Sequence, residues 1–239
     1  MIGVVINVAG ILIGGIAGLL RKKPFSVTVE SWGKIVLGVL MVFCGLRLTV
    51  INLGGSLGQI LKQLAIMILS MILGRLLGRL LRLQKMSNRI GEKAKQAITA
   101  AGSQTPRASE GFKTCCALFC AAPLGIVGSV VDGLSGYFYP LALKGLIDGL
   151  GTMGLVKVFG WGAILSALPV LAFQGTIALL CAKVLGPYLQ AYALIPSVNA
   201  VSGMLIFTVA LVILQIKRIE MADYIPSLAI APLITALWR

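Results

Sequence analysis

An all-α integral membrane protein is the fold class that the sequence predicts, and three observations predict it. The 239-residue chain is 58% apolar and only 12% charged, with a mean hydropathy of +1.00, which excludes an ordinary soluble domain. Its apolar residues gather in runs of about 20, the length of a membrane-spanning helix. Its 21 basic residues, against 7 acidic ones, gather between alternate runs, as they do in cytoplasmic loops.

The apolar runs predict about eight transmembrane helices. In chain order they lie at residues 1–20, 35–51, 60–81, 112–131, 138–156, 161–182, 194–216 and 223–238. The basic residues Arg21 to Lys23 follow the first run, whereas a cleavable signal peptide has the reverse order. If either the fourth or the fifth run is re-entrant, seven helices remain.

The basic residues also predict the orientation of the chain. Placing Arg21 to Lys23 in the cytoplasm puts sixteen of the 21 basic residues inside and four outside, with Lys144 inside a run. Both termini are then expected outside the membrane, on the face opposite to the cytoplasm. The positive charge therefore suits the anionic headgroups of the bilayer, and no nucleic-acid partner is expected.

The longest polar stretch, residues 83–111, predicts an amphipathic helix between the third and fourth runs. Met86, Ile90, Ala94 and Ile98 recur every four residues among basic positions. We expect this helix to lie on the anionic cytoplasmic leaflet. The alternative is that it docks a cytoplasmic protein partner.

Three arginines precede this stretch at helical spacing. Arg75, Arg79 and Arg82 are four and three residues apart, so they share a face and are expected to reach lipid phosphates from the end of the third helix. Anion conduction is the alternative.

A faint internal repeat relates the first three helices to the last three. Three pairs of similar segments are offset by 160 to 165 residues. The pairs are Gly15–Leu20 with Gly175–Leu180, Gly38–Leu40 with Gly203–Leu205, and Leu64–Ile66 with Leu228–Ile230. Because five helices separate the two copies, they would cross the membrane in opposite directions, as in many transporters.

The repeat predicts how one membrane domain, residues 1–239, is organised. Residues 1–82 would form the first three-helix repeat and 161–239 the second. Between them would lie the amphipathic segment and a central two-helix unit at 112–157.

Two acidic residues and one basic residue lie in the apolar region. A charge there costs roughly 2.5–3.5 kcal/mol, so it needs a partner or an aqueous cavity. Lys144 and Asp148 are four residues apart, which places them on one helix face. Asp132 shares the local frame of Asp148, Asp-Gly-Leu. Each is a candidate ion or solute ligand; the alternatives are a purely structural ion pair and, for Asp132, a loop cap.

Prolines and glycines predict broken helices near these residues. Pro123 and Gly125 interrupt the fourth run ahead of Ser129, and Pro169 interrupts the sixth ahead of Gln174. Discontinuous helices are where transporters build solute sites, so we take Ser129 and Gln174 as candidate ligands.

Two further amides lie well inside apolar runs. Asn7 is in the first run and Asn199 in the seventh. With Gln174 they either line a solute site or form interhelical hydrogen bonds, each worth about 0.6 kcal/mol.

A stripe of small residues marks one face of the first helix. Gly10, Gly14 and Gly18 form two overlapping GxxxG units, which predict close packing against another helix. That helix could belong to the same chain or to a second copy, which would make a homo-oligomer.

The composition offers little for catalysis or metal binding. The chain has no His, and no Ser or Cys has a base placed to activate it. The closely spaced Cys115, Cys116 and Cys120 suit packing better than a soft-metal site, because no further ligand is spaced around them. We therefore expect no enzyme, no cofactor and no metal.

Several of these segments together resemble the YqgA-like family of bacterial membrane proteins. They are the opening Asn7–Leu20, Glu110-Gly-Phe, Gly125–Gly133, Lys144–Gly149, the segment around Pro169 and Gln174, and the closing Ala231-Pro-Leu. The family has no assigned function, and its members are often labelled transport proteins of the inner membrane. The resemblance thus implies a location and an architecture more than an activity. The cysteine-rich fourth run departs from the family pattern.

The function predicted from the sequence is a secondary transporter for a small solute. Asp132 and Asp148 would bind a coupling proton or small cation, Lys144 would hold Asp148 in one state, and the three amides would line the solute site near the bilayer midplane. The preferred solute is a small anionic or zwitterionic metabolite. The alternatives are an ion or solute channel, and a membrane adaptor that docks a partner through residues 83–111.

Overall fold

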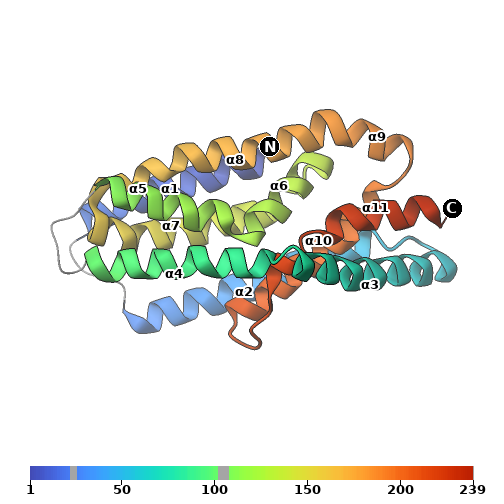
Figure 1. The fold of residues 1–239 in the computed structure, drawn as a ribbon, viewed down its shortest axis with the longest axis horizontal. Helices are drawn as coiled ribbons and strands as arrows, with labels where there is room; N and C mark the ends of the chain where they lie inside the picture. Colours follow the sequence, from blue (N-terminus) through green and yellow to red (C-terminus); the bar gives the residue numbers. More distant parts are fainter. Residues whose placement is uncertain (22–25, 102–107, 239) are drawn as a thin grey trace.

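The computed structural model describes residues 1–21, 26–101 and 108–238, and they form a bundle of helices (Figure 1). The helices are α1 (Ile2–Leu20), α2 (Val27–Ile51), α3 (Leu57–Leu80), α4 (Leu83–Ala101), α5 (Ala108–Ala121), α6 (Pro123–Ser135), α7 (Tyr139–Phe159), α8 (Ala167–Leu180), α9 (Gly186–Ala191), α10 (Ile195–Ile213) and α11 (Ser227–Leu237). Two 3₁₀ turns, η1 (Gly160–Ser166) and η3 (Met221–Tyr224), and a π-helical turn, η2 (Cys181–Leu185), connect some of them.

The apolar helices confirm an all-α membrane protein. Five helical stretches are long and apolar enough to cross a bilayer, and the bent pair α5–α6 would be a sixth. The five are Ile2–Leu20, Ser31–Ile51, Leu57–Leu80, Tyr139–Ala191 and Ile195–Ile213. The count of eight helices stays a prediction.

The longest of these stretches, Tyr139–Ala191, turns back on itself. Its 53 residues would measure roughly 80 Å as one straight helix, more than twice the thickness of a bilayer core. At Gly160 the backbone enters the left-handed region with φ of 72° and ends α7. Both α7 and α8 pack on α1 (Figure 1), so two arms of the stretch flank the same helix.

The predicted break at Pro123 is confirmed. Helices α5 and α6 meet at Ala122 with a bend of 58°. Pro123 occupies the first position of α6, where its missing N–H has no intrahelical partner to lose. Pro169 is different: it lies in the first turn of α8, so it does not itself break that helix, and the irregular backbone precedes it in η1.

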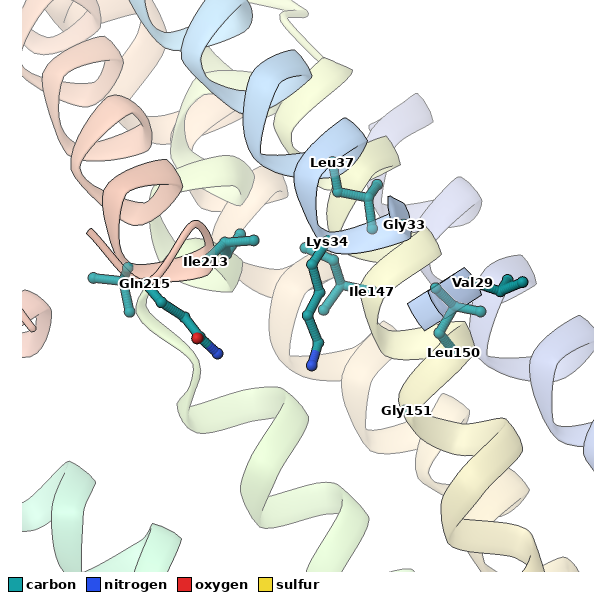
Figure 2. A pocket seen from close by; sticks show the side chains of 10 residues that line it. Val29, Gly33, Lys34, Leu37, Ile147, Leu150, Gly151, Ile213 and Gln215 are labelled. Carbon is teal, nitrogen blue, oxygen red and sulfur yellow. The ribbon is translucent and has the colours of Figure 1, made fainter. Parts of the chain in front are cut away.

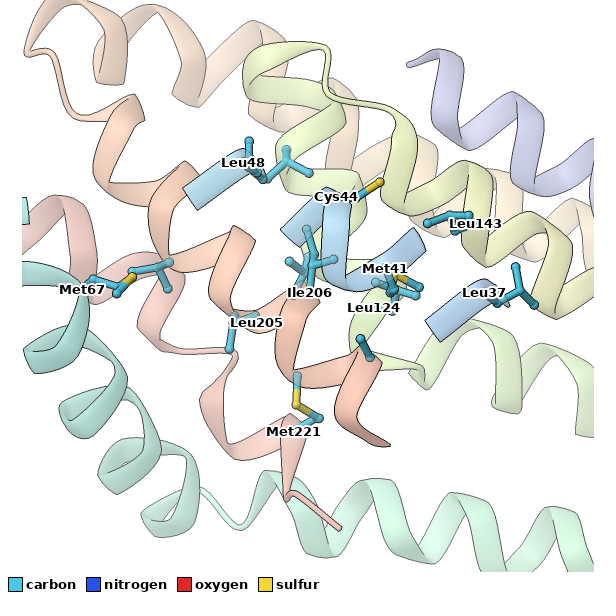
Figure 3. Close-up of a cluster of buried hydrophobic side chains, with 14 of the residues drawn as sticks. Leu37, Met41, Cys44, Leu48, Met67, Leu124, Leu143, Leu205, Ile206 and Met221 are labelled. Carbon is cyan, nitrogen blue, oxygen red and sulfur yellow. The ribbon is translucent and has the colours of Figure 1, made fainter. Parts of the chain in front are cut away.

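The core joins corresponding helices of the two predicted repeats. Helix α2 packs on α10, α3 on α11 and α1 on α8, although α1 makes its most extensive contact with α7. The main apolar cluster lies between α2, α6 and α10 and includes Met41, Leu124 and Ile206 (Figure 3). The pairing suits a repeat, but the inverted repeat and the division of the chain at 82, 111 and 157 stay predictions.

The amphipathic segment differs from expectation in two ways. Its apolar face packs on α5, α7 and η3, with Ala94 buried, while Met86 stays 58% exposed. Its last residues, from Ala108, belong to α5, and residues 102–107 lie outside the described part of the chain. Much of the face predicted to meet lipid is therefore covered by protein.

Candidate functional site

The centre of the candidate site is an ion pair inside the bundle. Lys144 Nζ donates to Asp148 Oδ2 on the same face of α7. The two residues are only 2% and 5% exposed. The Lys144 ammonium also lies 5.8 Å from the ring centre of Phe119 on α5, within the range of a cation–π contact. The predicted pair is therefore formed, and it is buried.

Two amides from other helices meet beside this pair. Asn7 Nδ2 donates to Gln174 Oε1 at 2.8 Å, and the Asn7 side chain also lies beside Asp148. Both amides are fully buried. Among the described residues, Asn7 Oδ1 and Gln174 Nε2 have no hydrogen-bond partner. The site thus holds one unused acceptor and one unused donor, a costly arrangement in a folded interior.

Glycines bring α1 close enough to α7 for this contact. A Cβ on Gly14 would overlap the carbonyl group of Gly149, and one on Gly149 would lie 2.6 Å from the Gly10 oxygen. A Cβ on Gly145 would lie 2.9 Å from the Asn7 Cα. The glycines that follow Lys144 and Asp148 therefore let α1 approach α7 closely, and Gly145 does so at Asn7 itself.

The same contact answers the question left open for the glycine stripe. Gly10, Gly14 and Gly18 all face α7 of their own chain, so this stripe is occupied and does not hold a second copy. Of the two alternatives, the contact within the chain is therefore the one formed, and a homo-oligomer through these three residues is not supported.

Helix α6, which begins at the break after α5, forms another side of the site. A Cβ on Gly125, in the first turn of α6, would lie 3.0 Å from Gln174 Nε2 and 3.1 Å from Lys144 Cε. The missing side chain therefore leaves room for both groups at the start of α6. Ser129, the predicted ligand one turn later, is fully buried and donates to the Gly125 carbonyl at 2.7 Å.

A cavity of about 300 Å³ reaches Lys144 and Asp148. Ala122 and Pro123, at the helix break, line it. The remaining wall comes from α4, α6, α7, α10, η3 and the segment before η3, namely Gln84, Ser87, Leu124, Ile147, Val209, Val212, Ile213, Ile219 and Met221. The cavity therefore adjoins the buried pair and has room for a small molecule.

A second cavity, of about 500 Å³, lies between α2, α7 and α10 (Figure 2). It shares Ile147, Val212 and Ile213 with the first. Among the described residues its lining is apolar apart from Lys34 and Gln215, so it offers one basic group and no carboxylate.

Asp132 lies elsewhere and has a different environment. In the last turn of α6, its Oδ1 accepts from the Met1 ammonium group at 3.0 Å and its Oδ2 from the Val4 N–H at 3.4 Å. It therefore caps the start of α1, and the structure does not bring it to the Lys144 pair.

Asn199 also belongs to another cluster. Its Nδ2 donates to Asn52 Oδ1 at 3.3 Å, and its Oδ1 accepts from Ser135 Oγ at 3.4 Å. These contacts join α10 to the ends of α2 and α6. Of the three amides predicted to line one site, only Asn7 and Gln174 meet.

The three predicted lipid-contact arginines are partly engaged within the chain. Arg75 and Arg79 lie 3.8 and 3.4 Å from a carboxylate oxygen of Glu220, and Arg75 lies over the Tyr224 ring. Arg82 has a φ of 56° at the junction of α3 and α4. Their contact with lipid phosphates stays a prediction.

One part of the cavity wall was not predicted. The Gln84 N–H donates to Asp223 Oδ1 at 2.8 Å, and Gln84 Oε1 accepts from the Ala222 N–H at 3.0 Å. These bonds fix the start of α4 over the cavity. No local signal in the sequence indicates a contact between residues so far apart.

The cysteines of α5 take no part in this geometry as ligands. Cys115 is buried, and Cys116 and Cys120 are partly exposed. Within the described residues, no three or more Asp, Glu or Cys side chains gather as a metal site would require.

Comparison with known proteins extends the resemblance over the whole chain. Residues 2–236 match a family described as "Protein of unknown function (DUF554)". The "Uncharacterized membrane protein YdfK" of Bacillus subtilis (strain 168) is 30% identical, and the match covers 98% of this chain and 95% of that protein. The "Uncharacterized protein YqgA" of Escherichia coli (strain K12) is 25% identical over 100% of this chain and 97% of its own length. No solved structure matches. The resemblance to the YqgA-like family is confirmed.

Proposed function

The chain belongs to the DUF554 family, and we propose that this multi-pass membrane protein is a secondary transporter for a small solute. The observation that carries the proposal is the cavity that reaches the buried Lys144–Asp148 pair at the break between α5 and α6. Secondary transporters place their solute and coupling-ion sites at such breaks.

The stability of the folded chain does not by itself explain why this ion pair is buried. Apolar residues of similar volume are often as stable as a buried ion pair, or more stable. The site also leaves two buried amide atoms without partners, each of which costs about 1–3 kcal/mol. Irregular backbone at membrane depth is tolerated where it lines a cavity. These costs are explained if the site must exchange partners with a solute.

In this proposal, four residues have distinct roles. Asp148 binds a coupling proton or small cation, and Lys144 holds it in the state without that ion. Asn7 and Gln174 orient the solute. Asp132 is left out because its carboxylate caps α1.

We also propose an orientation in the bacterial cytoplasmic membrane, with both termini outside. The part of the cavity wall formed by Gln84 and Ile219 is then on the cytoplasmic side, because Ile219 directly follows the basic residues Lys217 and Arg218. A fluorescent reporter that matures only in the cytoplasm should stay dark at the C-terminus. A bright C-terminal reporter would contradict this orientation.

Transport can be tested without knowing the solute. The purified protein is reconstituted into vesicles loaded with a mixture of amino acids, small carboxylates and small amines, and the solutes retained after dilution are measured by mass spectrometry. Wild type should release one class of solute, and Asp148→Asn should retain it. Lys34→Gln, in the apolar cavity, is the matched control and should behave as wild type. Equal release from wild type and Asp148→Asn would contradict the proposal.

A carrier and a channel then differ in counterflow. Preloading vesicles with the released solute should accelerate its uptake through a carrier. Uptake that does not respond to preloading would indicate a channel built from the same residues.

A further inference from the structure

We infer that the ligand of the Lys144–Asp148 cavity is a small zwitterion, with one carboxylate and one ammonium group as in an amino acid. The inference deepens the proposed function by naming the solute class, and it rests on that function only for the claim that the ligand is also transported. Three features of the cavity and of the residues beside its charged pair support it independently.

The first feature is charge balance. Among the residues that the structure describes, Lys144 and Asp148 are the only charged ones that line the cavity, so their charges cancel. An anion or a cation alone would leave one buried charge without a partner, which is strongly unfavourable. A zwitterion can separate the pair and give each residue a new partner of opposite sign, and the buried charge still sums to zero.

The second feature is the pair of unsatisfied amide atoms. Gln174 Nε2 is a free donor and Asn7 Oδ1 a free acceptor, and both side chains are fully buried. Gln174 Nε2 adjoins Lys144 at Gly125, and Asn7 lies beside Asp148. The spare donor thus accompanies the cation and the spare acceptor the anion. A carboxylate can use the first set and an ammonium group the second.

The third feature is the polarity of the broken helix. Pro123 and Leu124 begin the 13-residue helix α6 and line the cavity, so the positive end of that helix dipole faces it. Ala122 follows the end of α5 and also lines the cavity, which brings the negative end of the α5 dipole to the same place. Such ends attract a carboxylate and a cation respectively.

The size of the cavity suits a small ligand. Its volume of about 300 Å³ is at the small end of ligand sites.

The test compares a zwitterion with its two halves at matched size. Melting of the purified detergent-solubilised protein is measured with each common amino acid, and with propionate and ethylamine, which carry the two charged groups of alanine separately. At least one amino acid should raise the melting temperature by several degrees, while neither half does so at equal concentration. If no amino acid stabilises the protein, or if propionate stabilises it as much as the best amino acid does, the inference is overturned.

Charge variants should change the preferred ligand. Asp148→Asn leaves Lys144 without its partner, so propionate should stabilise this variant more than any amino acid does. Lys144→Gln leaves Asp148, so ethylamine should become the best ligand. A purely structural pair would not produce this exchange, and unchanged preference in both variants would overturn the inference.

A glycine pair keeps the test valid if the charge variants do not fold. Gly125→Ala adds a methyl group between Gln174 and Lys144 and should weaken the amino-acid shift. Gly175→Ala, beside Gln174, meets nothing within 4 Å and should leave it unchanged. An equal shift in both variants would place the ligand elsewhere. Binding without solute release would overturn transport but support the zwitterion, whereas release of another solute without amino-acid binding would overturn the zwitterion alone.

Discussion

Asp132 and Asp148 share one sequence frame and occupy opposite kinds of environment. Each is followed by Gly and Leu, and each is at most 5% exposed. Asp132 ends α6 and accepts hydrogen bonds from the start of α1. Asp148 lies inside α7, with Lys144 as its partner, a cavity beside it and unsatisfied amides around it.

The difference shows that burial of a charge does not by itself indicate a functional site. The Asp132 carboxylate has fixed partners and completes a helix end, so its burial has a structural explanation. The Asp148 carboxylate adjoins groups that lack partners and a space that a ligand could fill. The capacity to exchange partners is what separates the two sites.

The largest expected difference concerns solute release. Asp148→Asn should abolish release from loaded vesicles, because it removes the exchangeable charge, whereas Asp132→Asn should retain most of it. Both variants are compared in the same vesicle assay at equal protein content. Loss of release in Asp132→Asn alone would reverse the two roles.

A second expected effect concerns the glycine contact that positions Asn7 beside Asp148. Gly149→Ala places a methyl group 2.6 Å from the Gly10 oxygen and should destabilise the protein by about 1–3 kcal/mol, typical of overpacking. Gly154→Ala, on the same helix, meets nothing within 4 Å and should be neutral or stabilising by roughly 0.5–1 kcal/mol. Thermal melting of the two variants measures the difference. Equal melting temperatures would show that α1 and α7 do not pack this closely.

The structural role of Asp132 predicts a smaller loss. Asp132→Asn keeps the side-chain shape but removes a charge at the start of α1, so it should lower stability by about 0.3–2 kcal/mol. Chemical unfolding in detergent is the measurement. A stability equal to that of wild type would show that this cap contributes nothing.

The exposed ion pairs should contribute the least to stability of the contacts compared. Arg79 and Glu220 are about half exposed, and such pairs contribute about 0–1 kcal/mol. Glu220→Gln should therefore change the melting temperature very little, and less at high salt. A loss as large as that of Gly149→Ala would mean that this contact holds η3 in place.

The sequence predicts the helices of this fold better than it predicts which helices pack together. The helical spans, the break at Pro123 and the pairing of Lys144 with Asp148 follow from local patterns of period 3.6 and from proline chemistry. Other features depend on contacts between residues that are more than 100 positions apart in the chain. They are the helix that meets the Gly10 stripe, the cap role of Asp132 and the separation of Asn199 from Asn7. Periodicity carries no information about such contacts.

The cavity is the part of the site that was hardest to predict. Its wall includes Gln84 and Ser87 from a helix whose pattern predicts a surface position. Many glycines of this chain only allow helices to pack closely, whereas Gly125 makes room for two polar side chains. Space of this kind is set by the arrangement of several helices, which no single segment encodes.

Solute release by the double variant Lys144→Met with Asp148→Leu tests most directly whether the buried pair serves exchange or only structure. Breaking the pair on one side costs about 3–5 kcal/mol, while replacing both charges by apolar residues is often neutral or stabilising. We therefore expect the double variant to melt at or above the wild-type temperature and to release no solute. Release at the wild-type rate from this stable variant would contradict the proposed site.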